Sequence, residues 1–365
     1  MRIVELGDNS AAGYCGRLFA LAGHEVIRVD SMDAGPMDHS ALALDIYLHS
    51  DKKRLTLNYQ SPAGRQVLSD LIDHADVLVA DLLPQDLDRL NWPVLGESNR
   101  KLIRASISPF GLSGPYRDWK GWGPVLLAMG GTTELIGDPG REPLSLPGNI
   151  VEYQAGQYAY IAICAHLLHS ARGAHTIEVS LLETVLSPSQ FTTVLWTCNG
   201  VIRTRYGNAW SNLHPIAMYP CRDGWFLVNV VPDFWPAFTR MLGREELMQD
   251  PRFATSQARV ENRQALDSII IERLADSTMA EITELGQRHF RVPTGGALTF
   301  PELLAHEHLT ARQFFREVRL RGEGVLRVPG SAYRYVNPEG WADNPPSTGL
   351  WQARGNVEDG DARSA

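Results

Sequence analysis

The stretch KRLTLNYQSPAGRQVLSDLIDHADVLV, residues 53–79, predicts in succession a strand at 54–58, a helix at 62–74 and a second strand at 77–79. Ser61 and Pro62 mark the start of the helix, because the serine hydroxyl can cap free amides and proline lacks only an N–H that the first turn leaves unpaired. Outside this stretch, further strands are predicted at 3–6, 25–29 and 102–107, with a helix at 11–22. The alternation predicts an α/β fold, a Rossmann-like domain whose parallel sheet is wrapped by helices.

The rest of the chain predicts a second, smaller domain. A long apolar helix is predicted at residues 154–170, and the apolar run at 177–182 fits either a buried strand or the start of the next helix. From about residue 206 the pattern changes to a hairpin and then to helices at 234–242, 264–275 and 279–288. We therefore predict a large domain at 1–200, a smaller α+β domain at 206–320, a return to the large domain at 321–350 and a disordered tail at 351–365.

Composition is that of a globular protein. The chain has 365 residues, of which 44% are hydrophobic, which is enough for a substantial core. Its formal net charge of -8 argues against nucleic acid as a partner, so an anionic ligand would need a local cluster of cations. Lys52, Lys53, Arg54 and Arg65 could form such a cluster, although a solvated strand end explains the same charges equally well.

Cysteine and histidine spacing give no sign of a metal site. The four cysteines lie far apart without C-x-x-C spacing, and the chain starts without a charged leader and a long apolar run, so we expect a reducing, cytoplasmic location. No window approaches roughly 18 uninterrupted apolar residues, so we expect no membrane span. The histidine pairs at 166 and 169 and at 306 and 308 lack an obvious set of partner ligands, so we expect no metal.

A dinucleotide cofactor is disfavoured by the first turn. Asp30 ends the second predicted strand, where an acid that binds ribose would lie. However, Gly7, Gly13 and Gly16 do not form the G-x-G-x-x-G pattern that lets a backbone approach pyrophosphate. We therefore do not expect an NAD enzyme.

The segment SISPFGLSGPYRDWKGW, residues 106–122, has the properties of a ligand-binding loop. It follows an apolar strand, its glycines permit close backbone approach, and Arg117, Lys120 and two tryptophans offer charge and flat apolar surface. These features suit a ligand that bears a nucleotide. A well-packed surface turn is the alternative explanation.

Several segments in order resemble the family III CoA-transferases, which include formyl-CoA and carnitine CoA-transferases, with the alpha-methylacyl-CoA racemases as a branch. The resemblance rests on AGHEVIRVD at 22–30, KRLTLN at 53–58, SPAGR at 61–65, ADVLV at 75–79 and the loop at 106–122. It implies a cytoplasmic transferase with a CoA-binding Rossmann-like large domain. It also implies acyl-CoA and carboxylic acid as substrates, no metal, and a dimer of interlocked chains.

The resemblance implies Glu152 as the catalytic nucleophile. In the family, an aspartate four residues before a glycine at the start of the long helix attacks acyl-CoA, and here Glu152 stands four residues before Gly156. Glutamate keeps the carboxylate but moves it by on the order of 1 Å, and a displacement of that size can cost about 10²-fold in rate. Two interpretations remain open, a glutamate nucleophile in an adjusted pocket and a member without the covalent step. A structural role explains Glu152 as well, because a negative side chain at the start of a helix interacts favourably with the positive end of the helix dipole.

By their place in the family's motifs, eight residues are implied to contact CoA: Ala11, Leu57, Asn58, Gln60, Asp81, Leu82, Arg89 and Lys120. Part of the usual CoA site is missing, because Ser31 replaces an arginine and residues 80–85 read ADLLPQ where the family commonly reads Glu-Asn-Phe-Arg-Pro-Gly. The glycine-rich loop of formyl-CoA transferase has no clear counterpart near residues 219–224.

Three functions are consistent with these residues. The first is a CoA-transferase, and the second is a non-catalytic subunit that pairs with an active paralogue, so a homodimer and a heteromer both fit. An acyl-CoA racemase is the weakest, because Trp122 stands where that branch has a histidine, and tryptophan exchanges no proton near neutral pH. Trp119, Trp122, Trp196 and Tyr153 hint at a bulky or aromatic acyl group, although each fits ordinary core packing.

Overall fold

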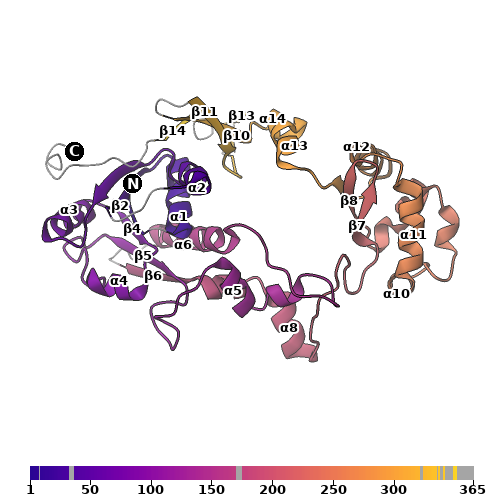
Figure 1. The fold of residues 1–365 in the computed structure, drawn as a ribbon, viewed down its shortest axis with the longest axis horizontal. Coiled ribbons are helices and arrows are strands. Elements are labelled where there is room, and N and C mark those ends of the chain that lie inside the picture. Colours follow the sequence, from indigo (N-terminus) through magenta and orange to yellow (C-terminus); the bar gives the residue numbers. More distant parts are fainter. Residues whose placement is uncertain are drawn as a thin grey trace. The chain divides into compact units, whose positions relative to one another are not determined.

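The structure is a computed structural model that describes residues 1–7, 9–32, 37–169, 175–320, 324–334, 336–337, 340–341 and 348–351. It divides into two compact units (Figure 1). The first unit comprises Met1–Thr133, Ser145–Ile202 and Glu307–Ala365, and the second comprises Glu134–Leu144 and Arg203–His306. Apart from Trp351, the tail predicted at 351–365 lies outside the described residues.

A parallel sheet of six strands forms the centre of the first unit. Its strands are β1 (Arg2–Leu6), β2 (Glu25–Ser31), β3 (Lys53–Leu57), β4 (Val77–Ala80), β5 (Ile103–Ser108) and β6 (His175–Ser180). They lie in the order β3-β2-β1-β4-β5-β6, and every neighbouring pair is parallel. This is the strand order of a Rossmann fold, so the predicted fold class is confirmed. The order reverses between β1 and β4, and a crevice is therefore expected at their carboxyl ends.

The helices of this unit cover both faces of the sheet, and both faces are apolar. Ile3 and Val79 belong to the core beside α1 and α6, whereas Val4 and Leu78 belong to the core beside α3 and α4. Strands buried on both faces are typical of parallel sheets. The helices are α1 (Ser10–Leu21), α2 (His39–His49), α3 (Pro62–Asp73), α4 (Pro84–Arg89), α5 (Gly123–Met129), α6 (Ile150–Leu168), α7 (Leu181–Leu186) and α8 (Gln190–Asn199).

Helix starts follow the local chemistry of the sequence. The Ser61 hydroxyl accepts the backbone N–H of Gly64 at 3.1 Å, so α3 begins as predicted. Helix α6 begins four residues earlier than predicted, at Ile150, which places Glu152 inside its first turn. The apolar run at 177–182 contains both predicted alternatives, because β6 ends at Ser180 and α7 starts at the next residue.

The second unit is a small antiparallel sheet covered by helices, in agreement with the predicted α+β pattern. Its sheet has the order β7 (Ile216–Cys221), β8 (Gly224–Asn229), β9 (Thr294–Gly296). Its helices are α9 (Trp235–Leu242), α10 (Ser256–Glu261), α11 (Arg263–Leu274), α12 (Met279–Glu284) and α13 (Phe300–Ala305), with a π-helical turn at Leu285–Phe290 and 3-10 turns at Pro232–Phe234 and Glu245–Met248. Phe226, Phe238 and Phe253 are fully buried at its centre.

Two boundaries of this unit were not visible in the sequence pattern. Residues 134–144, inside the stretch assigned to the large domain, belong to the second unit, and the chain returns to the first unit at Glu307 rather than at 321. The first difference arises because a hydrogen bond and an ion pair link residues 134–144 to residues far along the chain. The N–H of Gly207 donates to the carbonyl of Gly137 at 3.0 Å, and Arg205 pairs with Glu134 at 2.7 Å. A 3-10 turn at Thr133–Leu135 precedes this segment.

The C-terminal segment packs on the first unit through α14 (Glu307–Ala311) and a sheet of order β11 (Gly324–Pro329), β10 (Phe315–Leu320), β14 (Thr348–Trp351). A short hairpin, β12 (Val336–Asn337) and β13 (Gly340–Trp341), lies between β11 and β14 in the chain. The Arg17 guanidinium donates to the carbonyl of Pro329 at 2.6 Å, and the Trp351 indole N–H donates to Asp45 at 2.8 Å. These bonds join the two ends of the chain in one unit.

Candidate active site

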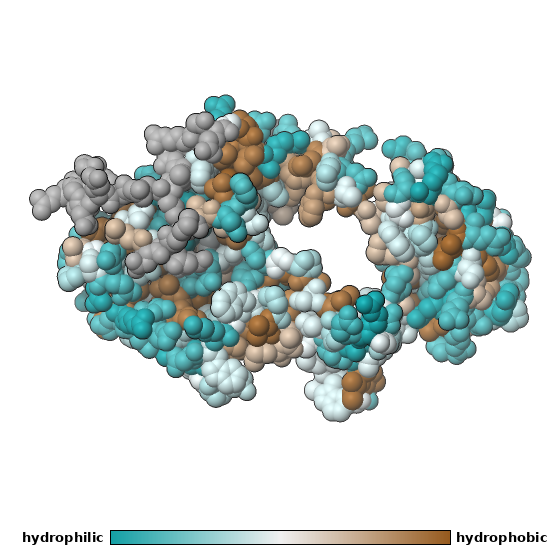
Figure 2. Space-filling model, in the orientation of Figure 1, coloured by the Kyte–Doolittle hydropathy of each residue, from teal (hydrophilic) through white to brown (hydrophobic). Residues whose placement is uncertain are grey.

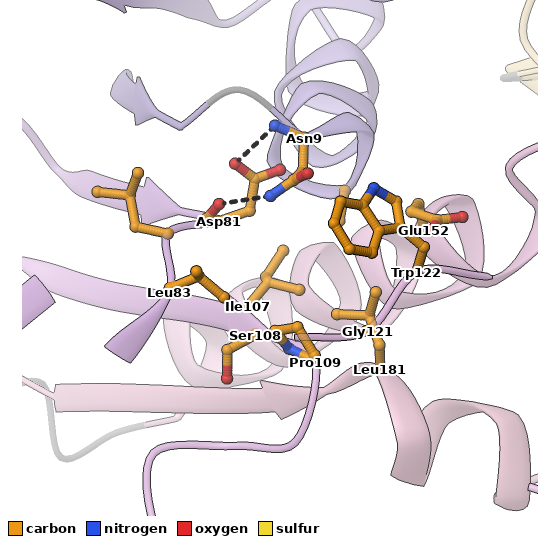
Figure 3. A pocket seen from close by; sticks show the side chains of 12 residues that line it. Asn9, Asp81, Leu83, Ile107, Ser108, Pro109, Gly121, Trp122, Glu152 and Leu181 are labelled. Carbon is orange, nitrogen blue, oxygen red and sulfur yellow. Dashed lines mark hydrogen bonds between the residues drawn. The ribbon is translucent and has the colours of Figure 1, made fainter. Parts of the chain in front are cut away.

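A pocket lies where the strand order reverses, at the carboxyl ends of β1, β4 and β5 (Figure 3). It is lined by Asn9, Ala11, Asp81, Leu82, Leu83, Ile107, Ser108, Pro109, Gly121, Trp122, Glu152 and Leu181. Figure 3 shows Trp122 and Glu152 on one side of the pocket and Asp81 and Leu83 on the other. Ligands of open α/β sheets bind at this kind of position.

Close packing of two helices brings Glu152 into the pocket. At Gly156, one turn after Glu152 on α6, an added Cβ would lie 2.5 Å from the carbonyl oxygen of Ala11 and 3.1 Å from the backbone nitrogen of Cys15. Both contacts are with the backbone of α1, so only glycine permits this approach. The first turn of α6 therefore lies next to the start of α1, where the pocket is formed.

The Glu152 carboxylate has one oxygen engaged and one available. Its Oε1 accepts the backbone N–H of Gly123 at 2.9 Å. Its Oε2 is buried and accepts no hydrogen bond from any described residue, and the carboxylate forms no ion pair within the described part of the chain. A buried polar atom without a partner needs an explanation, and a site for a reacting group is one such explanation. The arrangement can present a carboxylate oxygen to an electrophilic carbon.

Asp81, the second carboxyl group of the pocket, anchors the start of α1. It accepts the backbone N–H of Ala12 at 2.9 Å and that of Asn9 at 3.4 Å, and its side chain is almost fully buried. Burial raises the pKa of this carboxyl well above its ordinary value, although the bond from Ala12 acts in the opposite direction. Gly7, at φ +108°, makes room for it, because a Cβ there would lie 2.0 Å from the Asp81 Oδ1. Asp81 therefore shapes the pocket wall.

The structure brings four of the predicted site residues together. Glu152, Ala11, Asp81 and Leu82 all line the pocket, together with residues from both ends of the predicted ligand loop. The sequence analysis did not single out Asn9, Leu83 and Leu181. Each of the three follows closely after a parallel strand, and this position was the available signal, because the carboxyl ends of such strands meet at one edge of the sheet.

The other five predicted CoA contacts lie outside this pocket. Leu57 is buried in the core beside α3, and the Asn58 side chain accepts the backbone N–H of Gln60 at 3.1 Å in a turn. Arg89 is exposed and pairs with Asp86 at 2.7 Å. The side chains of Gln60 and Lys120 are exposed.

The loop after β5 is held by its own side chains. Arg117 forms hydrogen bonds of 2.8 and 2.7 Å to both carboxylate oxygens of Asp88, and its Nε donates to the carbonyl of Leu112 at 2.9 Å. Tyr116 and Trp119 stack at 3.9 Å between ring centroids. Arg117, one of the two cations predicted to face a ligand, therefore stabilises the loop.

Two cations of the basic run near residue 52 are engaged within the fold. Lys52 is buried and donates to Glu5 at 2.6 Å and to the carbonyl of Gly13 at 2.8 Å, and burial lowers its pKa to about 8. Arg54 is held by Asp30 at 2.8 Å and by Asp45 at 2.6 Å. The hypothesis of a basic cluster is wrong for these two residues, because acids distant in sequence neutralise both. Asp30 is likewise engaged by arginine rather than free to bind a ribose.

The described ranges contain no group of three or more His, Cys, Asp or Glu side chains that could hold a metal ion. None of the described helices combines the length and the apolar character that a membrane crossing requires.

Comparison with known proteins gives matches along nearly the whole chain. A family model described as CoA-transferase family III matches residues 1–350. A succinyl-CoA–D-citramalate CoA-transferase of Chloroflexus aurantiacus is 32% identical over 359 residues, which cover 94% of this chain and 89% of the relative. The beta subunit of a succinyl-CoA–L-malate CoA-transferase of the same organism is 26% identical, covering 78% of this chain and 74% of the subunit. Among solved structures, a CAIB/BAIF family protein from Brucella suis matches with a TM-score of 0.82 and 26% identity, covering 94% and 93% of the two chains.

Proposed function

Since the chain belongs to CoA-transferase family III, we propose that it moves CoA from an acyl-CoA thioester to a free carboxylic acid, with Glu152 as nucleophile. The observation that carries the proposal is that Glu152 lines the pocket and that its buried Oε2 has no described hydrogen-bond partner, while Oε1 is held by the Gly123 N–H. A carboxylate suits this reaction, because it serves first as nucleophile and then as leaving group.

The reaction proceeds through four exchanges at carbonyl carbons. The Glu152 carboxylate attacks the donor thioester, the C–S bond breaks, and an anhydride and a CoA thiolate form. The thiolate attacks the Glu152 carbonyl and releases the donor acid, leaving a glutamyl-CoA thioester. The acceptor carboxylate attacks this thioester to give a second anhydride and CoA thiolate. The thiolate then attacks the acceptor acyl carbon, which yields the new acyl-CoA and restores Glu152.

The pocket residues suit the reacting end of CoA. Ala11 and Leu82 provide apolar wall next to Glu152, and Asp81 holds the start of α1 in place. We propose that Leu57, Asn58, Gln60, Arg89 and Lys120 contact the remainder of the much longer CoA molecule. The two relatives described above take succinyl-CoA and a dicarboxylic acid, citramalate or malate, so we infer a short dicarboxylic acid as acceptor for this chain.

The test is mass spectrometry of the purified chain incubated with succinyl-CoA, with citramalate and malate as acceptors. We expect a CoA adduct on the peptide that contains Glu152. Glu152→Gln keeps the shape of the side chain but has no nucleophilic carboxylate, so it should lose the adduct and at least about 10³-fold in transfer rate. Glu97→Gln, at an exposed carboxylate, is the matched control. Unchanged transfer by the Glu152 variant would rule out the proposed mechanism.

A second candidate function is that of a non-catalytic subunit beside an active paralogue. The observation that favours it is α8, which buries no residue and exposes Val194 and Trp196 by 51% and 55% (Figure 2). We propose that a second chain covers this helix in an interlocked dimer. The relative that is named a beta subunit supports a heteromer as an alternative to a homodimer. Activity that appears only after addition of a paralogue with the usual aspartate would favour the second candidate.

A further inference from the structure

We propose that Gly123 is a positioning residue for Glu152. Because residue 123 has no side chain, there is room beside it for the Glu152 carboxylate, which extends one methylene farther than that of an aspartate. The Gly123 N–H determines which carboxylate oxygen remains to attack the thioester. The catalytic consequence rests on the function proposed above, whereas the contact itself can be tested without it.

The carboxyl group of Glu152 occupies the space that a side chain at position 123 would fill. A Cβ built on Gly123 would lie 3.1 Å from Oε2, 3.2 Å from Oε1 and 3.5 Å from the carboxyl carbon of Glu152. Contacts of 3.0–3.4 Å are tighter than nine in ten contacts that real Cβ atoms make, so the carboxyl group would have to move by a few tenths of an ångström. The three nearest atoms all belong to the Glu152 carboxyl group. Any larger residue at 123 therefore displaces the proposed nucleophile before it disturbs another part of the fold.

The N–H of Gly123 is a rigidly held donor. Gly123 is the first residue of α5, and Pro124 follows it in the first turn. The backbone N–H of Leu126 donates to the carbonyl of Trp122 at 2.9 Å, so the peptide that carries the Gly123 N–H is fixed by the helix. A fixed donor 2.9 Å from Oε1 holds the carboxyl group in one orientation, and Oε2 is left without a described partner.

Residues 123 and 152 therefore form a matched pair. An aspartate at 152 would withdraw the carboxylate by on the order of 1 Å. The bond from Gly123, now 2.9 Å, would then exceed hydrogen-bond distance. Conversely, the shorter side chain would leave room for a Cβ at 123. Glutamate at position 152 therefore requires glycine at position 123, and alanine at 123 should be harmless only when residue 152 is aspartate.

A cycle of four proteins tests the pair: the natural chain, Gly123→Ala, Glu152→Asp and the double variant. We expect Gly123→Ala to lower kcat by about tenfold with little change in KM for acyl-CoA, because it displaces a reacting group by a few tenths of an ångström, less than the roughly 1 Å that can cost about 10²-fold. In the Glu152→Asp background, the same substitution should change kcat less than about threefold. Equal losses in both backgrounds, or no loss from Gly123→Ala, would overturn the inference. Gly140→Ala is the control, because the nearest atom to its Cβ lies 3.7 Å away.

A second readout separates this inference from the proposed function. In protein labelled with 15N-glycine, Glu152→Gln should move the Gly123 amide resonance, because the acceptor of its hydrogen bond loses its negative charge. A Gly123 resonance that is indifferent to Glu152→Gln would refute the contact even if CoA adducts form. A resonance that moves in a chain that forms no adduct would leave the contact intact and refute the nucleophile instead.

Discussion

Two carboxyl groups line one pocket, and their neighbours give them different roles. Asp81 accepts two backbone N–H groups at the start of α1, so its oxygens are used by the fold. Glu152 accepts only the N–H of Gly123 among the described donors, so one of its oxygens remains available. The difference lies in hydrogen bonding and not in residue type, because both side chains end in a carboxyl group in the same crevice.

Gly156 determines how closely α6 approaches α1. We expect Gly156→Ala to lower the free energy of unfolding by about 1–3 kcal/mol, since its Cβ would lie 2.5 Å from the Ala11 carbonyl oxygen and force the helices apart. Transfer should fall as well, because Glu152 moves with α6. Urea unfolding measures the first effect and steady-state kinetics the second. Gly140→Ala should change neither, and a Gly156→Ala protein as stable as the natural chain would contradict this account.

At the level of secondary-structure elements, charged pairs join neighbouring strands. Glu25 at the start of β2 pairs with Arg2 of β1 at 2.8 Å and with Lys53 of β3 at 2.7 Å. In the buried part of the sheet, Arg28 of β2 pairs with Glu5 of β1 at 3.0 Å. Pairs of this kind explain why the sequence left the run of cations around residue 52 open to two explanations, a basic cluster and a solvated strand end. Their acidic partners belong to other strands and to α2.

The Glu25 pairs predict a specific dependence on pH. Hydrogen bonds from Lys53 and Arg2 lower the pKa of Glu25 to about 2, against 4.5 for the free group. The unfolded chain therefore binds more protons between these values, so this contribution to stability is present above pH 4.5 and is lost as pH falls towards 2. Because the pair is partly exposed, Glu25→Gln should cost only about 1 kcal/mol at pH 7.

Urea unfolding of the two proteins at pH 7, 4.5 and 3 measures this difference. We expect it to be largest at pH 7 and to shrink at pH 3. Glu97→Gln serves as the exposed control and should follow the natural chain at each pH. A difference that stays constant across the three values would contradict the assignment.

For the whole molecule, the exposed apolar residues of α8 predict a second chain (Figure 2). The double variant Val194→Glu, Trp196→Glu should shift the protein from dimer to monomer in sedimentation velocity, because charged side chains would enter the contact. The free energy of unfolding of the monomer should change little, since α8 buries none of its residues. Val94→Glu, at a position that is 42% exposed elsewhere in the first unit, is the control. A natural chain that sediments as a monomer would refute the dimer.

Much of the architecture was predictable, because its causes are local. The strand β4 and the helix α3 follow from periodicity and from a Ser-Pro helix start, and both appear within one residue of their predicted limits. Residues 134–144 were misplaced, because their membership of the second unit depends on bonds to Arg205 and Gly207. The dimer and the roles of the eight implied CoA contacts remain predictions.

The chain's local patterns were sufficient to establish an α/β protein of alternating strands and helices, and its linked motifs were sufficient to indicate the family. Folding was needed to bring β1 beside β4, to set Glu152 beside Gly123, and to bury Lys52 against Glu5. The physical reason is the separation in sequence between the residues that interact. Helix starts and strand periodicity depend on neighbours within a few residues, whereas hydrogen-bond partners and burial depend on segments that meet only in three dimensions.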